Sequence, residues 1–265
     1  TLVPGSLIKA YKKPSPGPWY EVFPESSGVV SNPSDYDATV KITCGDTGHF
    51  ILAPRGLIEC SHGGVASYNI QISSEGNQYI RGKIDCSGLD STDTNADNGG
   101  NVTLIAGDDT HQTGDILITG TIDTHGGGCL GPTCIGSGGN GGNIEITSDD
   151  DNNPTTATTI WIGAKSISTS GGGSEAGEGR GGNAGNIHVR SGGDSGDMTN
   201  IFVNSKIELS GGDSAGGVGG NGGVNVPTDA SLRLNTKGAN CDGSSDGMIV
   251  IVSGSGDGKI ISNGG

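Results

Sequence analysis

The sequence predicts an all-β protein: a single-stranded parallel β-helix (β-solenoid) with an aromatic-richer N-terminal β cap and long glycine-rich loops. Composition is the first reason, since glycine occupies 53 of 265 positions while only 31% of the residues are hydrophobic and 4% aromatic. That is too little apolar material for a helical bundle or a doubly wound α/β enzyme, which leaves disorder or a thin-cored β architecture. An internal repeat of short strands and the absence of hairpin turns between them then favour the solenoid.

The N-terminal part of the chain differs from the rest in composition. Most of the prolines lie there, and so do eight of the ten aromatic residues: Tyr11, Trp19, Tyr20, Phe23, Tyr36, Phe50, Tyr68 and Tyr79. We therefore expect residues 1–65 to form an N-terminal cap or assembly segment of ordinary packing. Residues 66–265 are expected to form the β-helix, with about six irregular coils.

Beyond residue 80 the chain repeats a unit of three short strands. The first strand of each unit follows a Gly-Asn turn in GGNVTLI (99–105), GGNIEIT (141–147) and AGNIHVR (184–190). Equivalent positions recur every 42–43 residues, a period typical of solenoids and propellers. Alternation predicts these inward-facing pairs: Val102 and Leu104, Ile144 and Ile146, Ile187 and Val189.

Two further strands complete each unit. The second lies in DILITG (115–120), TIWIGA (159–164) and NIFVNS (200–205), and the third in TIDTHGG (121–127), SISTSGG (166–172), KIELSGG (206–212) and an earlier copy, KIDCSG (83–88). No Asn-Gly or Asp-Gly hairpin turn joins neighbouring strands, as antiparallel propeller blades would require. A solenoid pairs each strand with its equivalent in the next coil, so the sequence predicts parallel sheets with glycines at the corners and long loops leaving the coil.

The predicted coils become irregular toward the C-terminus. We expect one coil to start at Val224 and Val226 and to continue through Leu232 and Leu234. A last, shorter coil is expected over residues 249–260.

The pattern GGNAGNIHV, followed by two alternating strands and a closing I-x-L-S-GG, resembles the repeats of filamentous-haemagglutinin-type adhesins. The resemblance covers roughly residues 99–213. It implies a secreted, right-handed parallel β-helix with a structural or adhesive role at the cell surface.

Two sets of residues are candidate interfaces. In the second strand of each unit, Leu117, Trp161 and Phe202 alternate with the inward positions and should stack outside, coil upon coil. An exposed apolar stripe usually has a cover, here either the N-terminal segment or a long loop of the same chain, or another subunit.

The ends of a solenoid form the second candidate interface, because their strand edges must be capped or paired. The segment SLIKAY (6–11), with Leu7 and Ile8, is a candidate donated strand, and KIISNGG, with Ile260 and Ile261, offers the opposite edge. Head-to-tail contacts that do not close produce open polymers, so self-association into a filament or contact with neighbouring adhesin subunits is predicted.

Catalytic chemistry is sparse in this sequence. IRGKIDCSG (80–88) is similar to a segment of polygalacturonases, but the Gly-His-Gly and Arg-Ile-Lys motifs of that family are absent from the sequence. Glycoside hydrolysis needs two carboxylates about 5–10 Å apart, whereas Asp108 and Asp109 point in opposite directions on an extended strand. We expect Asp85 and Asp123 to be outward residues of neighbouring coils, and we predict no catalytic residues.

Charge and cysteine content limit the partners and the compartment. The net charge of −15 argues against nucleic acid, and no apolar run is long enough to span a bilayer. No cofactor or metal ligand is predicted; acidic loops such as 148–154 and 241–247 leave Ca²⁺ as a weak alternative. A local disulfide between Cys129 and Cys134 is expected, and Cys44 and Cys60 are further disulfide candidates.

Disulfides favour a secreted or cell-surface protein, whereas free thiols in a reducing compartment are the alternative. The sequence as a whole predicts an extracellular structural or adhesive protein, a self-assembling filament subunit joined through solenoid edges or a donated strand, which is not an enzyme. A glycan or other cell-surface ligand fits the same surface, so the alternative is a carbohydrate-binding or polysaccharide-degrading β-helix, with Trp161 as its best single ligand-binding residue.

Overall fold

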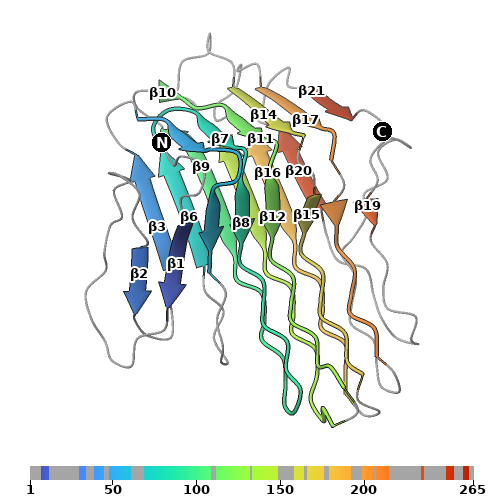
Figure 1. The fold of residues 1–265 in the computed structure, drawn as a ribbon. Coiled ribbons are helices and arrows are strands. Elements are labelled where there is room, and N and C mark those ends of the chain that lie inside the picture. Colours follow the sequence, from blue (N-terminus) through green and yellow to red (C-terminus); the bar gives the residue numbers. More distant parts are fainter. Residues whose placement is uncertain are drawn as a thin grey trace.

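The chain is all-β in the computed structural model, and no described residue is helical. The structure describes residues 7–11, 30–33, 39–44, 48–60, 69–108, 112–131, 133–148, 158–163, 166–175, 179–191, 199–205, 207–214, 234–235, 249–253 and 259–262. Their strands form three sheets whose neighbours are parallel, apart from the short strand β10 (Gln112–Thr113), which pairs antiparallel with β9. Figure 1 shows the strands of successive repeats lying side by side along one direction.

Each repeat contributes one strand to each sheet. Sheet 1 takes the first strand, in the order β3 (Thr39–Cys44), β6 (Asn69–Ser74), β9 (Val102–Asp108), β13 (Ile144–Ser148), β16 (Ile187–Ser191) and β20 (Ile249–Ser253). Sheet 2 takes the second, in the order β4 (Phe50–Leu52), β7 (Gln78–Ile80), β11 (Ile116–Ile118), β14 (Thr158–Ile162), β17 (Thr199–Val203) and β21 (Lys259–Ser262).

Sheet 3 takes the third strand of the repeats, two strands from the N-terminal segment and one short strand that comes before β20 in the chain. Its order is β2 (Val30–Pro33), β1 (Leu7–Tyr11), β5 (Leu57–Glu59), β8 (Lys83–Asp85), β12 (Thr121–Asp123), β15 (Ser166–Ser168), β18 (Ile207–Glu208) and β19 (Leu234–Asn235). Equivalent strands of successive coils are thus hydrogen-bonded neighbours in all three sheets, an arrangement consistent with a parallel β-solenoid.

The predicted register of the repeats is confirmed. Ile144 lies opposite Val102 on one side and Ile187 on the other, so the 42- and 43-residue steps align the first strands. Trp161 lies between Leu117 and Phe202 in the same way in sheet 2. Sequence spacing alone therefore identified the correct partner for each central strand.

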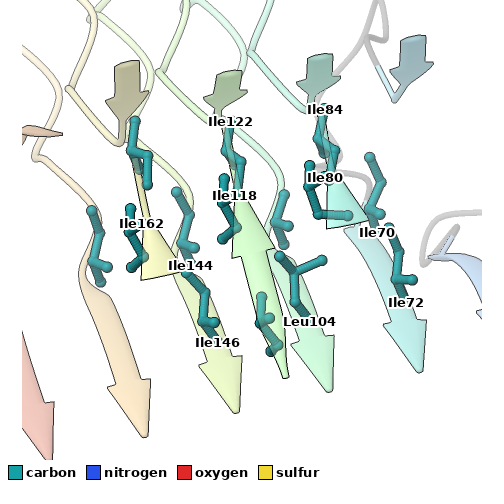
Figure 2. Packing of buried hydrophobic residues seen from close by; sticks show 14 of the residues in the cluster. Ile70, Ile72, Ile80, Ile84, Leu104, Ile118, Ile122, Ile144, Ile146 and Ile162 are labelled. Carbon is teal, nitrogen blue, oxygen red and sulfur yellow. The ribbon is translucent and has the colours of Figure 1, made fainter. Parts of the chain in front are cut away.

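A single core of stacked aliphatic side chains joins the three sheets. Inward residues of all three sheets belong to one buried cluster, and Figure 2 shows isoleucines of successive coils in parallel columns, among them Ile80, Ile118 and Ile162 of sheet 2. The predicted inward pairs of the first strands are all at most 2% exposed. Each fully buried isoleucine contributes roughly 1.5–3 kcal/mol of transfer free energy, so a narrow core made almost entirely of aliphatic side chains, with Phe50 as its one aromatic residue among those described, holds the stack together.

The repeating strands begin earlier than the expected boundary near residue 65. Strands β3, β4 and β5 already pair in register with β6, β7 and β8, although they lie within the segment expected to be a cap. The aromatic-rich composition of this segment predicted a cap, but the inward positions of its coil include the same kind of buried aliphatic residue as the other coils, such as Ile42, Leu52 and Ile58. The candidate donated strand β1, with Leu7 and Ile8, pairs with β5 and β2 of its own chain.

The C-terminal coil differs from the prediction. Strand β20 pairs directly with β16, so Ile249 occupies the position next to Ile187 that was expected for Val224. Val224 lies outside the described residues, and Leu234 belongs to sheet 3, opposite Ile207. A short Val-x-Val alternation does not by itself identify the partner of a strand. Strand β20 has five residues, and all five pair in register with β16.

Candidate functional site

The outer face of sheet 2 carries an apolar column with one residue per coil. The column, here called the sheet 2 stripe, consists of Ile51, Tyr79, Leu117, Trp161 and Phe202. Each lies between two inward-facing residues, so strand alternation forces it outward. Ile261 of β21 follows Phe202 in register, which extends the column by one backbone position.

The two large aromatic side chains of the stripe pack against each other. The ring centroids of Trp161 and Phe202 are 5.2 Å apart with the planes tilted by 35°. Trp161 is nevertheless 37% exposed, whereas the other stripe residues are half-buried. At the other end, the Arg81 guanidinium lies 5.8 Å from the Tyr79 ring centroid, and Asn77 Nδ2 donates a hydrogen bond to the Tyr79 hydroxyl at 3.0 Å.

A ladder of side-chain acceptors fixes the spacing of the stripe. The Asn77 N–H donates to His49 Nδ1 at 2.8 Å, the Asp115 N–H donates to Asn77 Oδ1 at 2.9 Å, and the Thr159 N–H donates to Asp115 Oδ1 at 2.8 Å. Each acceptor lies just before a sheet 2 strand and binds the backbone of the next coil. The stripe is therefore held at the parallel-strand spacing of ~4.8 Å, with hydrogen-bonding groups along one side.

The outer face of sheet 3 carries a column of acidic and hydroxyl side chains instead. Asp85 and Asp123 are register neighbours, as expected from the sequence, and Glu59 and Ser168 continue the column on either side. Lys83 Nζ lies 2.5 Å from Asp85 Oδ2, and the Ser87 hydroxyl donates to Asp85 Oδ1 at 2.7 Å. This column is partnered by cations and hydroxyl donors.

The ion pair between Asp123 and His125 in this column shifts the pKa values of both residues. His125 Nδ1 lies 2.7 Å from Asp123 Oδ1, and this hydrogen bond raises the pKa of His125 above its ordinary value even though partial burial opposes the shift. Burial acts to raise the pKa of Asp123, but the hydrogen bond and charge of His125 outweigh it and lower that pKa. A general acid for glycoside hydrolysis needs a raised carboxyl pKa, whereas the lowered pKa of Asp123 favours its ionised form.

The glycine-rich segments between sheet 3 and sheet 1 are the feature that the sequence reasoning missed. Each runs outward over one limb (87–91, 125–129, 170–174 and 210–214) and, in the three complete cases, back over a second limb (94–101, 136–143 and 179–186). We call these limbs together the glycine wing, and their ribbons extend away from the sheets in Figure 1. Isolated parallel bridges join Ser91, Cys129, Ser174 and Ser214 of successive outward limbs.

Backbone hydrogen bonds cross between the two layers of the wing and run continuously through the stack. Gly139 N donates to Gly127 O at 2.9 Å, Gly172 N to Gly139 O at 2.8 Å, and Gly182 N to Gly172 O at 2.8 Å. A Cβ atom on Gly126, Gly138 or Gly171 would overlap a backbone carbonyl oxygen of the opposite layer, and one on Gly139, Gly172 or Gly182 would overlap a carbonyl oxygen of the preceding coil in its own layer. Only glycine permits this approach, so the loops are a packed extension of the solenoid.

Asparagine side chains line the return limbs. The Asn140 N–H donates to Asn98 Oδ1 at 2.7 Å, and the Asn183 N–H donates to Asn140 Oδ1 at 2.9 Å. A second ladder joins Asn69, Asn101, Asn143 and Asn186 in the same way. The available signal was a glycine at every third position, as in 136, 139 and 142 and again in 179, 182 and 185.

The cysteines resolve only partly as expected. The predicted disulfide between Cys129 and Cys134 is present, with a Cα–Cα distance of 5.8 Å, and it closes the tip of one wing segment. Cys44 and Cys60 are free thiols at the ends of strands in different sheets. Neither of these two candidates is in a disulfide in this structure, and the register places Cys60 beside Cys86.

Neither a metal-binding cluster nor a membrane-spanning helix is found among the described residues. The part of the chain that the structure describes has no cluster of three His, Cys, Asp or Glu residues suited to a metal ion, and most of the acidic loops lie outside it. It also has no helix long and apolar enough to cross a membrane. Comparison with known proteins found no matching family model, curated protein or solved structure.

Proposed function

We propose that this protein is an extracellular structural or adhesive rod, a single-stranded parallel β-helix of about six coils whose sheet 2 stripe docks onto a partner. The stripe carries the proposal. The column has five outward apolar residues and includes an exposed tryptophan that packs on a phenylalanine, so it forms a continuous apolar surface. The regular coil spacing presents these side chains in a line along the rod, which suits a repetitive or elongated partner.

Other features support an extracellular role without enzymatic activity. The Cys129–Cys134 disulfide is typical of oxidising compartments. Asp123 has a lowered carboxyl pKa and therefore does not resemble a protonated general acid, and Asp85 is engaged by Lys83 and Ser87. The resemblance of residues 99–213 to filamentous-haemagglutinin-type adhesin repeats agrees with this role.

We further propose that copies of the rod join end to end into a filament. In sheet 3, β1 pairs with β5 through Leu7 opposite Leu57 and Ile8 opposite Ile58. Exchange of β1 between copies would preserve these pairings across two chains, as in domain swapping. Edge pairing through β21, with Ile260 and Ile261, is the alternative joint.

Electron microscopy of the purified chain tests assembly, and a paired substitution tests the stripe. We expect ordered filaments from the wild-type chain. Their loss in Trp161→Ser/Phe202→Ser, with an unchanged circular dichroism spectrum, would show that the partner of the stripe is another copy of the chain, whereas filaments that persist in this variant would assign assembly to the ends of the rod alone. The matched control is Glu145→Ser/His188→Ser, which alters two exposed register neighbours of sheet 1. Dispersed short rods from all three proteins would remove the assembly proposal and leave adhesion to be tested by binding.

Carbohydrate binding is the second candidate, and the exposed Trp161 ring favours it. Aromatic faces stack on sugar rings, and the ladder of His49, Asn77 and Asp115 lies along one side of the stripe. Retention of the wild type on immobilised polysaccharides, together with loss of retention in the stripe variant alone, would support this candidate. Release of reducing sugars from the same polysaccharides would instead indicate the polysaccharide-degrading alternative.

A further inference from the structure

Two cysteines of adjacent coils occupy equivalent positions at the ends of sheet 3 strands. Strands β5 and β8 pair with Glu59 opposite Asp85, so the next residues, Cys60 and Cys86, are neighbours across the two coils. A backbone hydrogen bond from Cys60 N to Asp85 O, 2.7 Å long, continues the ladder at this point. The two residues are therefore held in register by backbone on both sides.

Both side chains point into the core at the same corner of the coil. Cys60 is 2% exposed and Cys86 is 1% exposed. Their Sγ atoms lie against equivalent carbonyls, Cys60 Sγ at 3.6 Å from Asn69 O and Cys86 Sγ at 3.9 Å from Asn101 O. Burial raises the pKa of Cys86 well above the usual value, and a hydrogen bond with Cys60 adds to this shift. Such a thiol is a poor nucleophile, which argues against a catalytic role for Cys86.

The register brings Cys60 next to Cys86 and not next to Cys44. Neighbouring strands of a parallel sheet have Cα atoms ~4.8 Å apart, and disulfides accept Cα–Cα distances of about 4.4–6.8 Å. Cys44 lies at the end of a sheet 1 strand, opposite Ser74. In the next two coils the position of Cys60 and Cys86 is taken by Thr124 and Thr169, whose hydroxyls donate to backbone carbonyls.

We propose that Cys60 and Cys86 form an inter-coil disulfide in the oxidised protein, which ties the coil of β3–β5 to the coil of β6–β8. The bond forms by exchange with a low-molecular-weight disulfide. The two thiols lose two protons and two electrons, one S–S bond forms between them, and the oxidant is reduced to two thiols. Because both sulfurs are buried in the folded protein, the exchange takes place before the second coil closes over them. This inference does not depend on the proposed function.

Peptide mapping of the full chain tests the pairing. The reduced chain is refolded with oxidised and reduced glutathione, its remaining thiols are alkylated, and the product is digested without reduction. Trypsin and Asp-N together release residues 56–81, in which Cys60 is the only cysteine, and residues 85–89, in which Cys86 is the only cysteine. We expect these two peptides to be joined, and reduction to separate them.

The Cys129–Cys134 disulfide serves as the internal control for oxidation. If that bond is found while Cys60 and Cys86 are both alkylated, or if Cys60 is joined to any other cysteine, the proposal is overturned. A second measurement compares the thermal unfolding midpoints of Cys60→Ala, Cys86→Ala and the double variant under oxidising conditions. A disulfide predicts the same loss in all three, roughly 5 °C or more, whereas losses that add in the double variant would indicate two independent packing groups.

Discussion

The outward residues of sheet 3 show how charges are accommodated on a tightly stacked surface. In-register stacking places like residues beside each other, so Asp85 and Asp123 would repel if nothing separated their charges. Lys83 neutralises Asp85, and His125 neutralises Asp123 when it is protonated. Each of these two aspartates thus has a basic side chain two positions away on its own coil, which offsets the repulsion between them.

The Asp123–His125 pair predicts a measurable titration. Because the pKa of His125 is raised in the folded protein, its stabilising effect is complete below about pH 6.5 and is lost as the pH rises through the folded-state value. The lowered pKa of Asp123 makes its effect present above about pH 4 and lost at lower pH. We expect NMR to give a titration midpoint for the His125 ring above the ordinary histidine value.

Substitution of the partner provides the control for that titration. In Asp123→Asn the midpoint should return toward the ordinary value, since the amide offers no charge to hold the proton. A midpoint that is unchanged in this variant would show that Asp123 is not the cause. The His125 side chain is 42% exposed, so the effect on folding free energy is expected to be small.

At the scale of the element, the glycine wing is the part that most constrains its own sequence. The backbones of neighbouring coils approach so closely in the wing that a single methyl group has no room at many glycine positions, while positions that face outward have space. Gly172 and Gly173 are consecutive and differ in this respect: a Cβ on Gly172 would overlap Gly127 O, whereas a Cβ on Gly173 would have its nearest neighbour, Asp213 O, at 3.4 Å.

This difference predicts the outcome of two neighbouring substitutions. Gly172→Ala should lower the free energy of unfolding by about 2–4 kcal/mol, because Gly172 must move away from Gly127 of the preceding coil and the hydrogen bond from Gly172 N to Gly139 O is lost. Gly173→Ala should change it by no more than about 0.5 kcal/mol. Urea denaturation followed by circular dichroism measures both. Equal losses would mean that this contact between coils does not set the stability of the wing.

The sheets were predictable from sequence and the wing was not, for a physical reason. Apolar alternation predicts strands such as Ile144–Ser148, and the repeat then identifies their partners. The limbs of the wing contain almost no apolar side chains, so no periodicity of hydrophobic residues marks them. Their signal is the spacing of glycine and asparagine, as at Gly139, Asn140 and Asn143, and its meaning depends on hydrogen bonds between coils.

The candidate site was predicted to a similar extent. Alternation placed Leu117, Trp161 and Phe202 in one outward column, but Ile51 was missed because its coil was assigned to the cap, and Tyr79 was not added to the column although it lies in the expected β-helix. The pairing of Cys60 with Cys86 also required the register of that coil. What such a column binds depends on its partner, so function is proposed from surface chemistry.

At the scale of the whole molecule, stability should be graded along the stack. Each coil contacts its two neighbours, as in other repeat proteins, so coils with two neighbours are held more firmly than those with one. Among the described strands of sheet 1, β9 and β13 are paired on both sides, whereas β3 and β20 are paired on one side only. The same order holds in sheet 2.

Hydrogen exchange measured by mass spectrometry should reveal this gradient. We expect the backbone amides of β9 and β13 to be the slowest to exchange, with protection decreasing toward β3 and β20. Peptides of equal length from the four strands serve as mutual controls. Equal protection in all of them would instead mean that the stack opens as one cooperative unit.

The three-residue period of the return limbs has a consequence for insertions. One extra residue between Gly136 and Gly142 would rotate the following glycines away from the return limb of the preceding coil, and the asparagine ladder would lose its partners in both adjacent coils. An insertion at the tip, between Cys129 and Cys134, would leave the phase of both limbs unchanged. The wing tips are therefore the places where added peptides can be displayed, in rows whose spacing the scaffold itself dictates.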